Sequence, residues 1–515
     1  MLINGIDIFN QGYAGAGGSM TSQALAGFNS WSGTATGDLY TRRILVSRAR
    51  QLAISQPMAA AVIDRMTGGI IGSGLKYMPA DKSDFIDNSL FESISKTITK
   101  RFKLASHLHM LDAQGLLDFA QMQELACRNW LLSGDVFFVR YGEKWRCIES
   151  DRCITPCLMS EARANQYTGI YYNPDNGNRI IDGVEIDSIG VPIAYWFLKD
   201  YITTPLIESY DQIERIPAYD PDGFRVVLHL YKPVRPDQYR GIPILADIIE
   251  SLHNLRNYTQ AELQAAQFQS AIWGFLTSEN PTFDETDSLS MDDLDEPINT
   301  GVEEQPHTST ENTVTMQITS DNGNNGNDIN DRILYNRVYP EPKRISAGQF
   351  MHLKAGEDVK FLQSTHPNNN YKGFMDAHNG AIASAVGIPR QVLECIYDGT
   401  YASARGSVLE ANRTFKNYRS FFINSFVRPV FERFVYSILK ENVYLQDEAS
   451  IISAGLAIES IWQSPIALCL DPAKELDAWN KAIQLGLVDR DEAAQALYGH
   501  KATGEISINE TKDYI

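Results

Sequence analysis

The chain has 515 residues, 43% hydrophobic and 21% charged, so it has the composition of a folded protein but is too long for one compact core. No run approaches the roughly 18 uncharged apolar residues that cross a bilayer, and the first Lys or Arg is Arg42, so neither a membrane nor a secreted protein is expected. The formal charge of −19 argues against tight DNA binding, but residues 279–331 carry −14 of it and the remainder only −5.

The N-terminal region is predicted to be helical after an unstructured arm. Residues 1–39 are rich in Gly, Ser, Ala and Thr and lack apolar periodicity, so we expect a flexible arm there. Over 40–67 apolar residues recur at helical spacing among basic ones, and Pro57 predicts a break between two helices. The glycines of 68–74 predict a turn.

A helix and then a β-rich region are predicted next. The stretch from residue 115 reads as a helix that Gly134 ends, and Val136–Tyr141 has the apolar, β-branched and aromatic content of a strand. In IIDGVEIDSIGVPIAYWFL two strand-like runs flank a Gly-Val-Pro turn, and RVVLHLY is apolar enough for the interior of a sheet.

The middle of the chain alternates between helical and acidic patterns. A long helix is predicted over 243–275, where Leu and Ile at 3–4 spacing give way to Ala and Gln after Leu255. Residues 277–331 are acidic, with few large apolar residues, so much of this segment is expected to lack a core of its own. Strands are predicted at 333–339 and 358–362.

The C-terminal part is predicted to be mainly helical. Helices are expected over 371–386 and 403–442, with Pro429 kinking the second, and the loop RQVLECIYDGTYA separates them. A final module holds a strand-like run, IALCL, and a helix over 474–484.

The six cysteines are too few to form a disulfide framework and fit a reducing compartment. Cys147, Cys153 and Cys157 cluster, but their spacing lacks the paired C-x2-C that tetrahedral zinc usually requires. We therefore expect buried free thiols in preference to a metal site.

No catalytic motif is complete. GGIIGSGLK resembles a phosphate-binding loop, but Leu75 separates Gly74 from Lys76, and Tyr77 stands where a Ser or Thr would hold Mg²⁺. A structural turn is favoured over nucleotide binding. No G-x-S-x-G elbow, H-E-x-x-H helix or EF-hand spacing is present, and His107 and His109 are two apart, so catalytic residues, metals and cofactors are not expected.

A series of segments, each weak alone, resembles the lambda-like phage portal family in one order over roughly residues 40–490. These segments are TRRILVSRARQLAISQPMAAAVIDRMTGGIIGSGL, WLLSGDVFFVRY, IESDRCITP, DGVEIDSIGVPIAYW, VLHLYKPVRPDQYRGIPILADII, AELQAA, AVGIPRQVLE, YASARGSVLEANR and LDPAKELDAWNKAIQLGL. The acidic insertion 279–331 and the plain N-terminal arm depart from the family.

The resemblance implies an α+β portal fold that assembles as a ring, usually of twelve subunits. In chain order its parts would be the arm (1–39), an α/β wing (40–242), a first stem helix (243–275), a small α/β clip with the acidic insertion (276–367), a second stem helix (368–388), a tunnel loop (389–402), a long kinked wing helix (403–442) and a helical C-terminal wing and crown region (443–515). The acidic insertion would repel DNA from the outer surface or meet basic sites on a terminase or tail adaptor; the alternative, a solvated spacer without a role of its own, remains open.

The resemblance also implies a function and partners. The ring would be the head-tail connector at one capsid vertex, through which double-stranded DNA passes without sequence specificity during packaging and ejection. It would bind the terminase large subunit, then tail or adaptor proteins, and the major capsid or scaffold protein, but no membrane. The protein would be in the virion, and in the host bacterial cytoplasm during assembly. ATP chemistry would belong to the terminase, so no enzymatic activity is expected.

The tunnel loop and the helix after it supply the candidate DNA-channel residues. Tyr397, Thr400 and Tyr401 lie near the loop tip, and Arg405, Arg413 and Lys416 follow it. Residues 405–433 contain six Lys or Arg and two Glu, and this local excess of positive charge favours weak, salt-sensitive contacts with phosphates. The alternative, a solvated helix face with salt bridges between subunits, remains open.

Two other functions remain open. One is a packaging ATPase or nuclease with unrecognised catalytic residues, which nucleotide turnover by the purified chain would reveal. The other is a different virion structural or adaptor protein, although such proteins are generally shorter and lack two stem-like helices around a clip.

Overall fold

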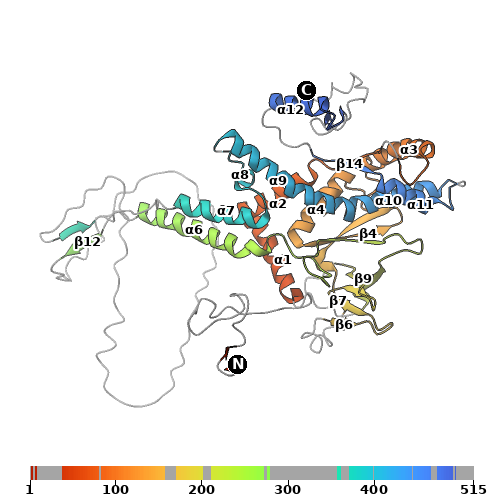
Figure 1. Cartoon of the computed structure of the whole chain (residues 1–515). Helices are drawn as coiled ribbons and strands as arrows, with labels where there is room; N and C mark the ends of the chain where they lie inside the picture. The colour runs from red at the N-terminus through yellow and green to blue at the C-terminus, as the bar shows by residue number, and fades with distance from the viewer. Residues whose placement is uncertain are drawn as a thin grey trace, which may run out of the picture. The chain divides into compact units, whose positions relative to one another are not determined.

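The computed structural model describes residues 2–3, 6–7, 38–80, 83–156, 170–200, 210–271, 275–278, 357–360, 371–397, 399–442, 445–465, 472–490 and 493–494. The chain divides into two units, one formed by residues 1–263 with 368–515 and the other by residues 264–367. Figure 1 labels their main helices and strands. The described strands of the second unit, Phe275–Ser278 (β12) and Glu357–Lys360 (β13), form an antiparallel pair.

The described residues of the first unit are mainly helical. The helical segments are α1 (Asp38–Ser55), α2 (Pro57–Ile71), α3 (Asn88–His107), α4 (Phe119–Ser133), η4 (Ser150–Arg152), η5 (Tyr210–Gln212), η6 (Ala246–Ile248), α6 (Ile249–Ala271), α7 (Tyr371–Val386), α8 (Arg390–Glu394), α9 (Tyr401–Phe422), the π-helical η8 (Ile423–Val427), α10 (Arg428–Lys440), α11 (Ala449–Ile458) and α12 (Pro472–Gln484). None of the helices in the described ranges is long and apolar enough to span a membrane.

The strands of the first unit form antiparallel sheets. They are β1 (Leu2–Ile3), β2 (Ile6–Asp7), β3 (Lys76–Met78), β4 (Asp135–Tyr141), β5 (Lys144–Glu149), β6 (Ile170–Tyr172), β7 (Arg179–Ile181), β8 (Val184–Ile186), β9 (Pro192–Leu198), β10 (Ile213–Pro217), β11 (Val227–Tyr231) and β14 (Ile461–Gln463). The larger sheets have the orders β10-β9-β8-β7-β6 and β11-β4-β5, and β1 pairs with β2 and β14 with β3.

Strand β4 lies between two hydrophobic cores. Because side chains alternate along a strand, Val136 and Phe138 face the core shared with the helices, whereas Phe137 and Val139 face a core shared with the five-stranded sheet. The whole strand interior is buried, which explains why DVFFVRY reads as a nearly continuous apolar run. The three-stranded sheet is thus the middle layer of the first unit.

Several predicted boundaries are confirmed. Pro57 begins α2 after the break that separates it from α1, and α7 ends at Val386 as expected. The two helices predicted as a stem contact each other, because the ring of Tyr258 on α6 lies 4.2 Å from that of Phe374 on α7. The strand-like runs 333–339 and IALCL, the acidic segment 279–331 and most of the N-terminal arm lie outside the described residues.

Other boundaries differ from the sequence-based expectation for local reasons. Helix α4 begins at Phe119, not near residue 115, because Asp118 and Gln121 form a capping box. The predicted helix 243–275 begins as the η6 turn, continues as α6 and ends at Ala271. The long helix 403–442 is α9, η8 and α10, and the π-helical η8 lies just before Pro429, where a wider turn accommodates a residue without an N–H donor.

Candidate functional sites

The predicted tunnel loop contains a short helix. Within 389–402, α8 occupies Arg390–Glu394, and Cys395 then ends it in the left-handed region, with φ of 56°. Gly399 has a φ of 143°, which L side chains rarely adopt, and Thr400 caps α9 by accepting a hydrogen bond from the Ser403 N–H at 3.3 Å. The loop is therefore a helical turn with defined ends.

Polar contacts fix this turn to the helices on both sides. Arg390 forms ion pairs with Asp376 on α7 and with Glu394 in its own helix. Asn379 donates to Glu394 at 2.6 Å, and the Ser407 hydroxyl of α9 donates to Gln391 at 2.8 Å. The exposed residues that follow are consequently presented from an anchored base.

Both predicted tyrosines are on the surface of this turn. Tyr397 is 38% exposed and Tyr401 39% exposed, and Lys474 of α12 lies over the Tyr401 ring, 4.9 Å from its centroid. Partial burial raises the pKa of Tyr397, with the neighbouring Cys395 adding to the effect. Thr400, the third predicted residue of the loop, has a structural role, because its side-chain oxygen caps α9.

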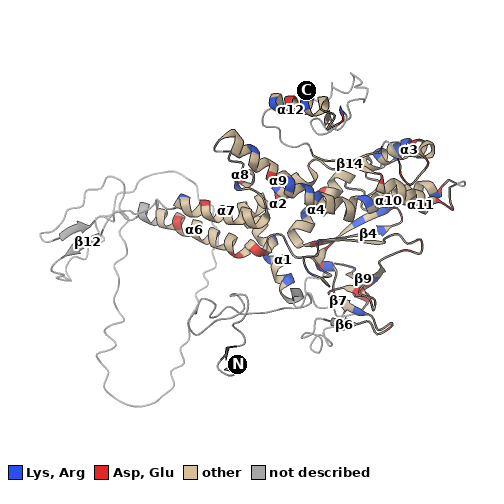
Figure 2. Ribbon diagram, viewed as in Figure 1, with Lys and Arg blue, Asp and Glu red and all other residues tan. Residues whose placement is uncertain are grey.

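The Lys and Arg residues of α9 divide into a group near the surface and one that bonds to another helix. Arg405, Arg413 and Lys416 lie in one sector of about 80° on α9, because α-helical residues are separated by about 100°. Arg413 and Lys416 are exposed and Arg405 is half-buried. Figure 2 colours the Lys and Arg positions along α9 blue. In contrast, Arg419 donates to the carbonyl oxygens of Gly69 and Ile70 at 2.7 Å each, at the C-terminal end of α2. Arg419 is thus a structural residue.

The phosphate-loop-like segment forms no phosphate-binding loop. Residues Gly68–Ile71 continue α2, so the turn predicted to start at Gly68 starts instead at Gly72, with φ of 56°. A Cβ atom on Gly69 would lie 2.5 Å from the ring of Phe415, and one on Gly74 would lie 2.5 Å from Ala120. These glycines allow close packing between helices, which supports the structural interpretation of the motif.

The clustered cysteines show no metal geometry in the described ranges. Cys153 is buried, Cys147 is half-buried, and burial raises the pKa of each thiol to about 12. Cys157 lies outside the described residues. Within the described ranges, no three His, Cys, Asp or Glu side chains converge to hold a metal ion.

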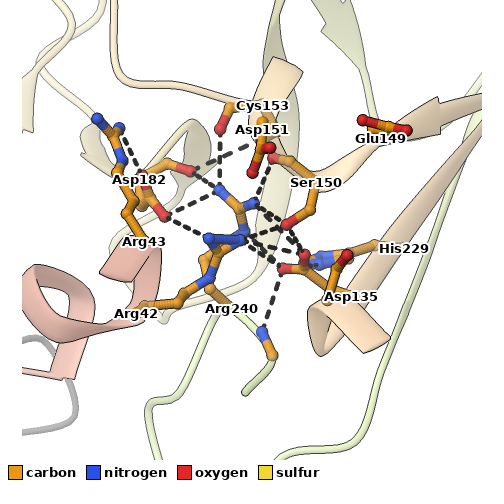
Figure 3. A network of polar contacts seen from close by, with 12 residues as sticks. Arg42, Arg43, Asp135, Glu149, Ser150, Asp151, Cys153, Asp182, His229 and Arg240 are labelled. Carbon is orange, nitrogen blue, oxygen red and sulfur yellow. Dashed lines mark hydrogen bonds and ion pairs between the residues drawn. The ribbon is translucent and has the colours of Figure 1, made fainter. Parts of the chain in front are cut away.

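A buried polar network was not predicted from the sequence. Arg240 is fully buried and donates through Nε to Asp135 Oδ2 at 2.7 Å and through Nη1 to Asp182 Oδ2 at 3.0 Å (Figure 3). Arg42 of α1 donates to Asp135 Oδ1 at 3.1 Å, and Ser150 contacts both Arg42 and Asp135. The network links α1, β4, the turn after β5 and the β7–β8 turn.

The charges in this network balance one another. Burial alone would raise the pKa of Asp135, but Arg240 and Arg42 hold it well below its ordinary range. His229 on β11 lies 3.4 Å from the same carboxylate, and its burial lowers its pKa to about 4, so the imidazole is neutral at pH 7. The network therefore holds these segments of the fold together. Its signal in the sequence was Asp135, a charged residue at the start of the otherwise largely apolar strand β4.

Comparisons with known proteins concern most of the chain. The family model described as "Phage portal protein, lambda family" matches residues 21–419. The "Probable portal protein" of Halomonas phage phiHAP-1 is 25% identical over 422 residues, which cover 78% of this chain and 69% of that protein. Among solved structures, the "Neck of native GTA particle computed with C12 symmetry" has 14% identity and a TM-score of 0.39, covering 92% of this chain and 98% of that one. The "Virion of native gene transfer agent (GTA) particle" has 14% identity and a TM-score of 0.41, covering 90% and 93%.

Proposed function

The chain belongs to the lambda family of phage portal proteins. From that premise we propose that it is one subunit of a dodecameric ring whose channel passes double-stranded DNA at one capsid vertex. The ring admits DNA during packaging and releases it during ejection. Terminase and then a head-tail adaptor dock on it, while capsid or scaffold protein surrounds it in the virion.

The α8–α9 turn supports the assignment of a channel surface. It combines two exposed tyrosines with an anchored base and places Arg405, Arg413 and Lys416 on one face of the following helix. A few cations are enough for weak DNA binding, because each Lys or Arg that contacts a phosphate releases counterions and so adds to the affinity. DNA must slide, so weak contacts without base recognition suit the role better than a strongly basic surface.

The stem assignment rests on the contact between α6 and α7. The stacked pair Tyr258 and Tyr371, with ring centroids 5.8 Å apart, extends the contact made by Phe374. Two packed antiparallel helices that bracket residues 276–367 fit a stem with an intervening clip. We further propose a wing formed by residues 40–242, a clip formed by 276–367 and a C-terminal wing and crown region formed by 443–515.

Electron microscopy of the purified protein tests the ring directly. We expect two-dimensional class averages of rings with a central hole, and light scattering that corresponds to about a dozen subunits. A chain that stays monomeric at high concentration in light scattering contradicts the proposed ring.

A double substitution tests the channel surface. We expect Tyr397→Ala with Tyr401→Ala to leave rings intact but to lower the amount of DNA that is packaged or retained. Tyr172→Ala on β6, another exposed tyrosine, is the matched control and should have no effect. Normal packaging and retention by the double variant, with rings verified, would remove these tyrosines from the channel.

A further inference from the structure

The two ends of α3 carry opposite charges. Residues 84–92 contain three acidic residues and no Lys or Arg, whereas 93–111 contain four Lys or Arg and no Asp or Glu. Figure 2 shows the basic side of this pattern along α3. Since α3 has 20 residues, its ends are about 30 Å apart.

Helix α11 lies against the acidic end of α3. A Cβ atom on Gly455 of α11 would lie 2.9 Å from Ile86, and the Asp84 N–H donates to the Glu459 carboxylate at 2.8 Å. Residues 447–459 contain three acidic residues and no Lys or Arg, whereas Glu441 is paired with Arg101 of α3 at 3.1 Å and is not part of this region. The two segments therefore form one acidic region.

Large apolar side chains are exposed within this region. Ile451 is 71% exposed and Phe85 63% exposed, and Ile458 is also exposed. The spacing of 451, 455 and 458 puts Ile451 and Ile458 on the same side of α11 as Gly455, which packs against the segment of Phe85 and Ile86. We define the acidic surface by its members, which are Asp84, Phe85, Asp447, Glu448, Ile451, Ile458 and Glu459.

The opposite end of α3 has a matching apolar and basic surface. Leu104 and Leu108, one helical turn apart, are 57% and 56% exposed, and Met110 follows them. A cavity of about 450 Å³ beside them is lined by Phe102 and Phe119 among others. The basic surface consists of Lys100, Lys103, Leu104, His107, Leu108 and Met110, and of these Lys103 and His107 also line the cavity.

Favourable helix-end electrostatics explain only part of this arrangement. Acidic residues at the start of a helix and basic ones at its end stabilise the helix dipole. That effect gives no reason for exposing Phe85, Ile451, Leu104 and Leu108. Apolar side chains grouped inside a charged rim are instead typical of protein interaction surfaces.

We propose that the acidic surface of one copy of this chain binds the basic surface of the next copy. The occupant of each surface is a second copy, because the two surfaces lie on one chain, have opposite charge and both expose aliphatic side chains. Contact between two different surfaces is heterologous, and repetition of such a contact closes a ring when the rotation permits. This inference rests on the proposed ring and adds the surfaces through which its subunits meet.

Cysteine crosslinking tests the contact in assembled protein. In a Cys395→Ser background, which removes an exposed thiol, Ile451→Cys combined with Leu104→Cys should give a ladder of covalent multimers with a short bis-maleimide. Each single variant should give no ladder, because its cysteine faces an aliphatic residue of the neighbour. The control pair Ile189→Cys with Leu104→Cys should also give none, since Ile189 is exposed in the β8–β9 turn.

Charge reversal gives an independent measurement. Lys100→Glu with Lys103→Glu should raise the protein concentration needed for assembly by tenfold or more. Adding Asp447→Lys and Glu448→Lys should restore assembly, which a general loss of folding would not allow. Rings that form normally with the reversed lysines and give no crosslinked ladder overturn this contact while leaving the proposed ring intact. Absence of rings in the unsubstituted protein would instead contradict the proposed function.

Discussion

Arg240 and Asp135 form an ion pair in which neither side chain reaches solvent, with Nε 2.7 Å from Oδ2. The same guanidinium donates to the backbone carbonyl oxygens of Cys153 and Ser150, at 3.0 and 2.8 Å. The Gly241 N–H adds a further donor to Asp135 at 3.1 Å. A single Arg thus satisfies groups from three separate segments, so the loss of its partner leaves several buried groups uncompensated.

Asp135→Asn should lower the free energy of unfolding strongly. The amide cannot balance the charges of Arg42 and Arg240, and removing one partner of a buried ion pair costs about 3–5 kcal/mol. Denaturant unfolding of the variant measures this change. Asp64→Asn is the matched control, because Asp64 pairs with Arg128 at 2.6 Å on the surface, where such a pair contributes about 0–1 kcal/mol. Equal losses in the two variants would contradict a special role for the network.

Stability should fall as the pH is lowered from 6.5 towards 4 because of His229. Burial lowers its pKa in the folded state to about 4 from the ordinary 6.5, so over this window the unfolded chain binds a proton that the folded chain does not. The free energy of unfolding then decreases by at most about 1.4 kcal/mol per pH unit. His229→Gln keeps a donor towards Asp135 but does not titrate, so its unfolding free energy should depend less on pH in this range. The same slope in both proteins would place the titration at another group.

Cys395 should be the first of the four described cysteines to react with a thiol reagent in the native protein. It is exposed, whereas Cys127 and Cys153 are buried and Cys147 is half-buried, and burial raises the pKa of the latter three thiols. Brief labelling at pH 8 followed by peptide mass spectrometry measures the order. Labelling of Cys153 before Cys395 would mean that the buried network opens readily.

Two adjacent glycines of α2 should respond oppositely to alanine. Gly69→Ala forces the Phe415 ring to move, because the new Cβ atom would lie 2.5 Å from it, and such overpacking costs about 1–3 kcal/mol. Gly68→Ala meets nothing within 4 Å and should stabilise the helix by up to about 1 kcal/mol. Thermal unfolding of both variants gives the comparison. A loss at Gly68 as large as that at Gly69 would indicate that backbone flexibility, not packing, explains both glycines.

Local chemistry in the sequence determined several element boundaries. Pro57 separates α1 from α2, and Gly134, with φ of 84°, ends α4 before β4 begins. These features depend on the missing proline N–H and on the conformational freedom of glycine, which act within one or two residues. The ordered series of family-like segments likewise indicated the portal family from the sequence alone.

Only the tertiary structure decided which charged residues are structural and which are exposed. Arg419 and Lys416 are alike in a sequence, yet Arg419 donates to carbonyl oxygens of α2, nearly 350 positions away, while Lys416 is exposed. Asp135 and Arg240 are 105 positions apart, and no local pattern pairs them. Helix and strand periodicity specifies which face of an element is apolar, but which elements meet at that face depends on packing of the whole unit, and that packing brings these distant charges together.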